Sequence, residues 1–457
     1  MTTSALSITN SRFKDWFFYL FIANYIYVIP QFRPLPTSLL TLGTILGIFL
    51  LVWDFRRCIS SYERKAFLGI SVLIFLVLYQ YFVDFFFLKK PSENILFIAA
   101  LFTIILFFGK VNLLRDELVL EKITKVYVVV LVISMFWYLA CYFSSPFYKF
   151  SNNLYQKDSL GFSSREISGL SQHAHLFGYQ LAPLCLILLT RIITANTKIS
   201  KILLIITILS LFTIFLLGER SVLIAVLFGL LPLIIKNTYR KRLLKLLLGL
   251  CCIFAVIIAF GGHKNISERY EYNILGRLSG EETNLEFKDR IKLQVVSLKI
   301  LFENPAGLVI GNKDWKKEAY SKDYKLFSTW RRVIAPHNGY LTMSVEYGWF
   351  MLILIVIMTI IVISIIRELM RLQNGNKAFS ENTLPLCCAM IGCLVQAMGH
   401  NASFSNLEPA TIVCMLLLFA WYSRVMQIKH EYINTSEVRP QTNEINISNL
   451  THFKDKS

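Results

Sequence analysis

Two arginines and one histidine, Arg220, Arg290 and His337, are residues of the types that act on a phosphorylated substrate. A guanidinium group pairs with phosphate oxygens through two parallel hydrogen bonds and keeps its charge at any working pH. Histidine has an unperturbed pKa of about 6.5, so it can accept a proton near neutrality. Two fixed cations and one base fit a transfer with a diphosphate leaving group, because the cations stabilise the departing charge and the base deprotonates the attacking hydroxyl group.

Each of these three residues also has a structural explanation. Arg220 stands between two apolar runs and could reach the membrane interface from a tight turn. Arg290, beside Asp289, could belong to a solvated helix face, and His337 could be a histidine at the interface with no chemical role. Residue type leaves these alternatives open. A shared role is favoured because the predicted topology, derived below without these residues, places all three on one side of a membrane.

The composition is that of an integral membrane protein. Of the 457 residues 55% are hydrophobic and only 17% are charged, whereas soluble proteins carry about 25% charged residues. Runs such as 67–88, 201–217 and 351–366 are nearly free of charge, and about 20 such residues cross the bilayer. We therefore predict an all-α polytopic membrane protein with about twelve transmembrane helices. The candidate spans are approximately 16–31, 36–53, 67–88, 94–109, 123–143, 173–190, 202–217, 221–235, 243–261, 339–366, 383–400 and 406–427.

The distribution of Lys and Arg predicts the orientation. If the N-terminus is cytoplasmic and the spans alternate, the cytoplasmic loops hold many more basic residues than the short periplasmic loops, as the positive-inside rule requires. These loops are 54–66, 110–122, 191–201, 236–245 and 367–377. The net charge of +18 does not indicate nucleic-acid binding, because Lys and Arg are concentrated in short linkers between apolar runs. No basic face is interleaved with stacking aromatic residues, so we expect no nucleic-acid partner.

This orientation divides the chain into four segments. Residues 1–261 hold about nine spans and a periplasmic loop at 144–172, and residues 339–427 hold about three more. Between them lies a large periplasmic loop, 262–338, and residues 428–457 form a cytoplasmic tail. The nine cysteines lie nearly all within apolar runs and lack metal-ligand spacing, so we interpret them as packing residues and expect neither a metal nor a cofactor.

The large loop contains one predicted helix. The residues from Thr283 to Glu286 form a capping box that opens it, and Pro305 ends it near Asn304. Four apolar residues recur on one face at helical spacing: Ile291, Val295, Leu298 and Phe302. This pattern is typical of an amphipathic helix that lies along the membrane surface and faces lipid.

The order of short motifs resembles the O-antigen ligase and O-antigen polymerase superfamily. His337-Asn338, nine further residues and Gly348 are similar to the ligase pattern, and Leu341 with Glu346-Tyr-Gly348 is similar to the broader family version. Three upstream motifs also resemble the family, in the same order. These are Arg165 to Gly169 before a span, Glu219-Arg220-Ser221 at a short outer turn, and Asp289-Arg290 on a helix that leads into Asn304-Pro305-Ala-Gly307.

The resemblance implies a metal-independent glycosyltransferase of the GT-C type in the bacterial inner membrane. Its donor would be a glycan on undecaprenyl diphosphate, and its site would lie at the periplasmic membrane face. Carried over to this chain, Arg220 and Arg290 bind the diphosphate and His337 is the catalytic base. Four further residues would support the site: Arg165, Asn338, Glu346 and Gly348.

The acceptor is left open by the motifs. It would be the lipid A-core for a ligase and a second lipid-linked repeat for a polymerase. We favour a ligase and keep the polymerase as an alternative. Ligases often carry a second glycine three residues after the first, where this chain has Met351, and this departure weakens the case for a ligase over a polymerase. A flippase for the same lipid-linked glycans is the alternative from the transporter class, although we find no internal repeat and few charged residues within spans.

Overall fold

The computed structural model describes about three fifths of the chain, and all structural statements below refer to those residues. They are residues 63–88, 101, 104, 117–155, 174–195, 200–217, 219–235, 239–246, 248–249, 283–323, 336, 338–372, 377–399 and 403–437. Within them every regular element is a helix and no strand occurs, so the predicted all-α class is confirmed.

Six of the described helices are long and apolar enough to cross a membrane, which confirms a membrane protein. They are α3 (Arg64–Val83, continued by the π-helical turn η1, Asp84–Leu88), α5 (Glu117–Phe143), α7 (Ala174–Thr194), α17 (Gly339–Leu372), α18 (Lys377–Gly399) and α19 (Pro409–Glu437). Shorter apolar helices are α8 (Lys201–Leu217) and the pair α9 (Arg220–Gly229) and α10 (Leu231–Ile235). The spans predicted at 16–31, 36–53, 94–109 and 243–261 lie wholly or mostly outside the described residues, so the total of about twelve stays a prediction.

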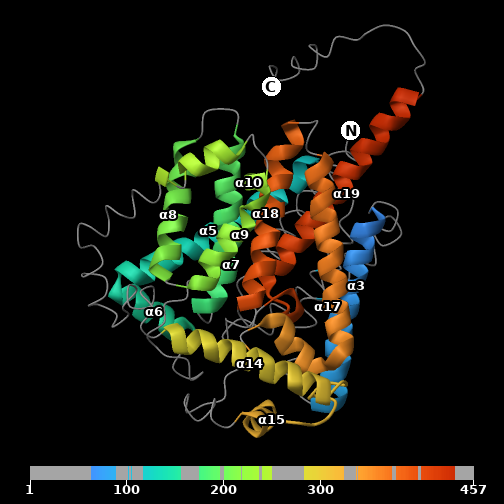
Figure 1. Ribbon diagram of the computed structural model, residues 1–457. Coiled ribbons are helices and arrows are strands. Elements are labelled where there is room, and N and C mark those ends of the chain that lie inside the picture. The colour runs from blue at the N-terminus through green and yellow to red at the C-terminus, as the bar shows by residue number, and fades with distance from the viewer. Residues whose placement is uncertain are drawn as a thin grey trace, which may run out of the picture.

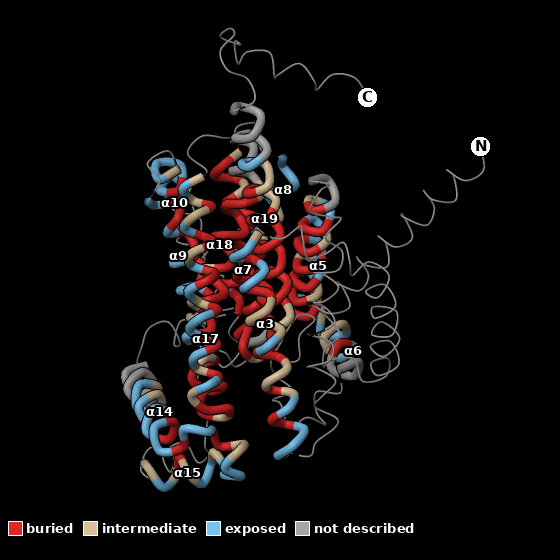
Figure 2. Tube along the Cα trace, turned by 90° about the vertical axis from the view of Figure 1, so that its right-hand side faces the viewer, coloured by how far each residue is buried: buried red, intermediate tan, exposed pale blue. Residues whose placement is uncertain are grey.

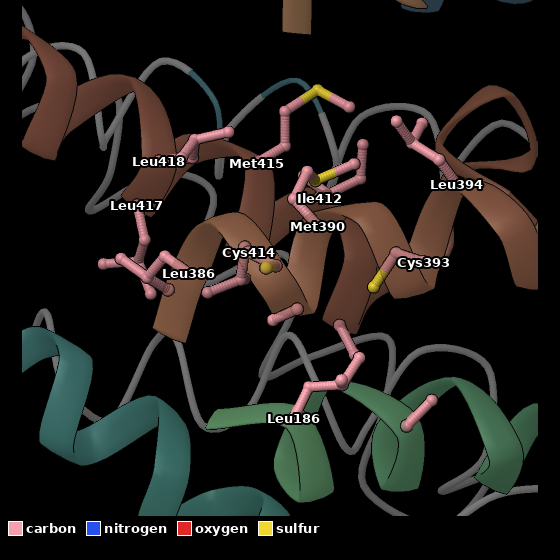
Figure 3. Close-up of a cluster of buried hydrophobic side chains, with 14 of the residues drawn as sticks. Leu186, Leu386, Met390, Cys393, Leu394, Ile412, Cys414, Met415, Leu417 and Leu418 are labelled. Atoms are coloured by element: carbon pink, nitrogen blue, oxygen red, sulfur yellow. The ribbon is translucent and has the colours of Figure 1, made fainter. Parts of the chain in front are cut away.

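The centre of the bundle is formed by α7, α18 and α19, which are buried along most of their length (Figure 2). Side chains of all three helices meet in a closely packed apolar cluster that includes Leu186, Met390, Cys393, Cys414 and Met415 (Figure 3). The six described cysteines are buried free thiols, as expected for packing residues. Exposed apolar side chains gather instead on the outer helices, including α3, α8 and α17, where lipid replaces water as the solvent.

One end of the bundle carries basic residues that were predicted to be cytoplasmic. Lys65 Nζ lies 2.6 Å from Glu368 Oε2, and the Tyr422 hydroxyl group donates to the same oxygen at 2.7 Å, which joins α3, α17 and α19. At the opposite end, α14 (Thr283–Glu303) and α15 (Trp315–Lys322) lie across the bundle (Figure 1). Which membrane face each end meets stays a prediction.

Two predicted segments differ from the structure. The segment predicted as loop 144–172 begins with a helix, α6 (Ser145–Tyr155), which is capped by Ser144 Oγ and joined to α5 by the hydrogen bond from Trp137 Nε1 to Ser151 Oγ. The span predicted at 221–235 is divided at Leu230 into α9 and α10. Pro232 explains the division because a proline supplies no N–H to the helical ladder and its ring crowds the preceding turn.

Candidate functional site

The last helix of the predicted site, α17, changes direction at Gly348. This glycine has φ 84° and ψ −173°, a conformation outside the helical region that only glycine adopts readily. Residues 339–347 therefore form a short helix of their own, which we call the half-helix, and the remaining residues to Leu372 form the long span. The span predicted at 339–366 lies within α17, Gly339–Leu372, but the sequence did not predict the break at Gly348.

The break at Gly348 is bridged by the turn that follows α14. Residues 304–307, Asn-Pro-Ala-Gly, pack directly on the Glu-Tyr-Gly segment of α17. Three backbone hydrogen bonds join the two segments: Leu308 N–H to Val345 O (3.0 Å), Val309 N–H to Glu346 O (3.1 Å) and Trp349 N–H to Pro305 O (2.9 Å). The turn thus satisfies carbonyl groups that the interrupted helix leaves without an internal partner.

Two glycines make this close approach possible. Gly307 has φ 91°, and a Cβ atom there would lie 2.5 Å from Glu346 O. A Cβ atom on Gly348 would lie 2.5 Å from Pro305 O. Both positions therefore favour glycine for two reasons: the positive φ angle disfavours residues with a side chain, and a Cβ atom would be too close to backbone atoms of the other segment. The two motifs that the sequence analysis read separately, Asn-Pro-x-Gly and Glu-x-Gly, form a single backbone-to-backbone junction.

The helix α14 begins and ends where the sequence predicted. It starts at Thr283 and ends at Glu303, where the Asn304 side-chain amide donates to Ile300 O at 2.9 Å. Arg290 lies in its first half and is partly buried. One face of α14 packs against α15 and the half-helix through a cluster of buried residues: Leu293, Val296, Ile300, Leu301, Leu308, Ala319, Leu341 and Val345.

The face predicted to meet lipid stays exposed. Ile291, Val295, Leu298 and Phe302 are each exposed by 44% or more. The Phe302 ring contacts Trp349 at a centroid distance of 5.2 Å, and the next residue, Phe350, is itself exposed on α17. The apolar row on α14 therefore continues into the outer face of a membrane span, which supports the prediction of a lipid contact.

We expect a fluorophore on this row to report an apolar environment. Leu298→Cys carrying an environment-sensitive dye, in lipid vesicles, should show blue-shifted emission that lipid-attached nitroxides quench, because the exposed row lies in the interface. The control is the same dye on Lys316→Cys, an exposed residue of α15, which should emit as in water. Labelled wild-type protein supplies the blank. Water-like emission from position 298 would contradict the lipid contact.

Asn338 fixes the beginning of the half-helix. Its side-chain oxygen accepts hydrogen bonds from the backbone N–H groups of Tyr340 and Leu341, each at 3.1 Å, which is the geometry of an N-cap. His337 directly precedes this cap in the sequence, but it lies outside the described residues, as does Arg165. Of the predicted supporting residues, Asn338 therefore holds one end of the half-helix, and Glu346 with Gly348 forms the other.

Arg220 is the first residue of α9. A Cβ atom on Gly399, at the end of α18, would lie 3.4 Å from Cβ of Ser221. The Tyr340 hydroxyl group donates to Leu394 O, one turn earlier on α18, at 3.1 Å. The starts of α9 and of the half-helix therefore lie at the same end of α18, whereas the helix that carries Arg290 is joined to the half-helix at its other end.

Three polar residues of α3 and η1 reach this region and were missed by the sequence analysis, which read 67–88 as nearly free of charge. The Tyr79 hydroxyl group donates to Tyr347 O at 2.9 Å. Gln80 Nε2 donates to Ser405 O at 2.7 Å, and Asp84 Oδ1 accepts from the Tyr347 hydroxyl group at 2.9 Å. The presence of Asp84 in an apolar run was the available signal, because an ionisable residue at membrane depth indicates function by default.

A second buried carboxyl group, Glu408, lies directly before α19. It accepts hydrogen bonds from the backbone N–H groups of Ala410 and Thr411 and so caps that helix. Burial raises the pKa of Glu408 above its ordinary value, although these hydrogen bonds act in the opposite direction. Within the described part of the chain, no three His, Cys, Asp or Glu residues are grouped so that they could hold a metal ion.

Comparison with protein families gives one match. Residues 205–356 match the family model described as O-antigen ligase. Over this stretch the chain is similar to the O-antigen ligase family. This confirms the resemblance to the ligase and polymerase superfamily. No curated protein shows significant similarity to the chain.

The matched stretch extends from α8 into α17. It therefore includes Arg220, Arg290 and His337, and the junction between the 304–307 turn and Gly348. The α3 residues that contact Tyr347 lie outside the matched stretch. The N-terminal helix α3 thus contacts the matched stretch at the half-helix.

Proposed function

We propose that this O-antigen ligase family protein is a metal-independent glycosyltransferase. It takes a glycan from undecaprenyl diphosphate at the periplasmic face of the bacterial inner membrane and transfers it to an acceptor sugar. The observation that carries the proposal is the family match over residues 205–356, because this one stretch holds both arginines and the histidine that the chemistry needs. Both termini are then cytoplasmic, in keeping with the positive-inside rule.

Arg220 and Arg290 bind the diphosphate of the donor in this proposal. Each guanidinium group offers a planar pair of donors to phosphate oxygens, and its charge does not depend on pH. As the bond between the anomeric carbon and the diphosphate oxygen breaks, negative charge grows on that oxygen, and preorganised cations stabilise it without reorganisation. The tight junction at Gly307 and Gly348 holds α14, which carries Arg290, against α17.

His337 is the base. It takes the proton from the acceptor hydroxyl group while the hydroxyl oxygen attacks the anomeric carbon. The new glycosidic bond forms, the old carbon–oxygen bond breaks, and undecaprenyl diphosphate leaves with the bonding electrons. Asn338 supports this role because its cap fixes the backbone of the residue that follows the histidine.

The acceptor that we propose is the lipid A-core, which makes the protein an O-antigen ligase in lipopolysaccharide synthesis. One observation favours the alternative, a polymerase that joins lipid-linked repeats. Met351, three residues after Gly348, is fully buried in α17, at the position where ligases often carry a second glycine. Both enzymes use the same donor chemistry and differ in the hydroxyl group that attacks.

Lipopolysaccharide from a deletion strain separates these functions on a gel. Loss of all long chains, with polymer retained on undecaprenyl diphosphate, indicates a ligase, and core capped by a single repeat indicates a polymerase. Complementation by Arg290→Ala should reproduce the deletion pattern, because one diphosphate contact is lost. The matched control is Lys299→Ala, an exposed cation on the same helix, which should restore the wild-type pattern. An unchanged ladder in the deletion strain would contradict both functions and favour a flippase.

A further inference from the structure

The break in α17 releases carbonyl groups, and one of them is satisfied by a different part of the protein. In an uninterrupted helix, each carbonyl accepts from the N–H group four residues later. At the junction, Val345 O and Glu346 O accept from the turn after α14, whereas Tyr347 O accepts from the Tyr79 hydroxyl group of α3. A buried carbonyl without a partner costs about 1–3 kcal/mol, so Tyr79 contributes directly to the geometry of the break.

The side chain of Tyr347 is held by α3 as well. Its hydroxyl group donates to Asp84 Oδ1 at 2.9 Å, and both residues are almost fully buried, with exposures of 5% and 4%. Asp84 begins the π-helical turn η1, a distortion that is frequent at functional sites. A carboxylate at membrane depth is retained only where a partner compensates its desolvation. The main chain and the side chain of Tyr347 are therefore both fixed by one helix.

The opposite end of the half-helix is connected to α3 through a second route. Gln80 donates to Ser405 O, and the Ser405 hydroxyl group donates to Gly339 O at 3.4 Å. Gln80 and Ser405 are fully buried. Consecutive residues of α3 thus hold both ends of the half-helix, one directly and one through the segment between α18 and α19.

We propose that Tyr79 and Asp84 are positioning residues for glycan transfer, which hold Tyr347 so that the half-helix presents His337 to the acceptor hydroxyl group. The inference rests on the proposed function. It assigns a role to α3, which lies outside the matched family domain. The physical reason is that the half-helix runs from the cap at Asn338, the residue after His337, to the break at Gly348, so a shift of Tyr347 would be passed along it towards the base. A displacement of about 1 Å can lower a rate by about 10²-fold.

Tyr347→Phe tests the inference by removing one hydroxyl group. We expect kcat for transfer of lipid-linked glycan, extracted from the deletion strain, to fall by about 10- to 100-fold, with the KM for this donor nearly unchanged. The acid limb of the pH–rate profile reflects protonation of the general base. It should flatten, because the rate depends less on the protonation of a base that is displaced from the acceptor hydroxyl group. Asp84→Leu should behave in the same way, whereas Asp84→Asn, which keeps an acceptor oxygen, should regain most of the rate.

The matched control is Tyr422→Phe. Tyr422 is also a buried tyrosine whose hydroxyl group donates to a carboxylate, Glu368, but it lies at the other end of the bundle. It should retain the kcat and the pH profile of wild type. If Tyr347→Phe accumulates poorly, Tyr79→Phe supplies the same measurement, because it removes a single partly buried hydrogen bond.

The outcomes separate this inference from the proposed function. Wild-type kcat and pH profile in Tyr347→Phe and Asp84→Leu, with an inactive His337→Ala protein, would overturn the positioning role alone. Full activity of His337→Ala would overturn the base itself, and the positioning role with it. Equal losses of kcat in Tyr347→Phe and Tyr422→Phe would mean that the loss comes from general destabilisation of the protein, which would also overturn the inference.

Discussion

Replacement of His337 by alanine is expected to slow glycan transfer by about 10²–10⁴-fold, the usual contribution of a general base. Without the imidazole, water must take the proton from the acceptor hydroxyl group as it attacks. Binding of the donor should change little, because we assign the diphosphate to Arg220 and Arg290. The loss should therefore appear in kcat and leave the KM for the donor close to its wild-type value.

This result is measured with purified protein in vesicles that contain lipid-linked glycan and acceptor. His430→Ala is the matched control, since His430 is an exposed histidine near the end of α19 and its loss should leave the rate unchanged. Both variants should insert at wild-type amounts. A near-normal rate in the His337→Ala protein would exclude the role of this residue as the base.

Gly348→Ala adds a single methyl group, and among the glycine-to-alanine substitutions that we consider it should destabilise the protein most. The new Cβ atom would lie about 2.5 Å from Pro305 O and from the carbonyl carbon of Ala306, both rigid backbone atoms. Alanine also disfavours the backbone conformation at this position, φ 84° and ψ −173°. The junction must open to relieve both, which separates α14 from α17. We expect a loss of about 3 kcal/mol or more in the free energy of unfolding.

Thermal unfolding of the purified variants in detergent tests this expectation. Gly348→Ala should unfold at a clearly lower temperature than wild type or fail to accumulate. Gly249→Ala is the control, because a Cβ atom on Gly249 would meet none of the described residues within 4 Å, and we expect it to unfold like wild type. Equal unfolding temperatures for wild type and Gly348→Ala would show that the junction accommodates a side chain.

The ends of α14 illustrate how far local sequence determines structure. A capping box at Thr283 and a proline at position 305 predicted a helix that the structure has at Thr283–Glu303, because caps and proline act on neighbouring backbone groups. The exposed apolar row was also predicted locally, from apolar residues at helical spacing within the same segment. The second apolar face, which includes Leu293 and Ile300, was not predicted, because its partners, α15 and the half-helix, lie in other segments of the chain.

For the candidate site, too, local sequence predicted some features and only the structure showed others. Residue types and their order were sufficient to identify the O-antigen ligase family, and with it Arg220, Arg290 and His337. Their roles remain predictions, since the structure does not describe His337 or the side chain of Arg220. The order of motifs did not reveal that Gly307 and Gly348 form one junction. That contact depends on a backbone crossing between segments that no local pattern relates.

The sequence by itself determined the membrane class, the helical composition, many helix boundaries and the family, because hydropathy, capping and short motifs are properties of neighbouring residues. Only the tertiary structure decided how α3 is used. Tyr79, Gln80 and Asp84 read as minor interruptions of an apolar run, and their partners are Tyr347 and Ser405, far along the chain. A buried polar group requires a partner, but which residue supplies it depends on the packing of distant helices.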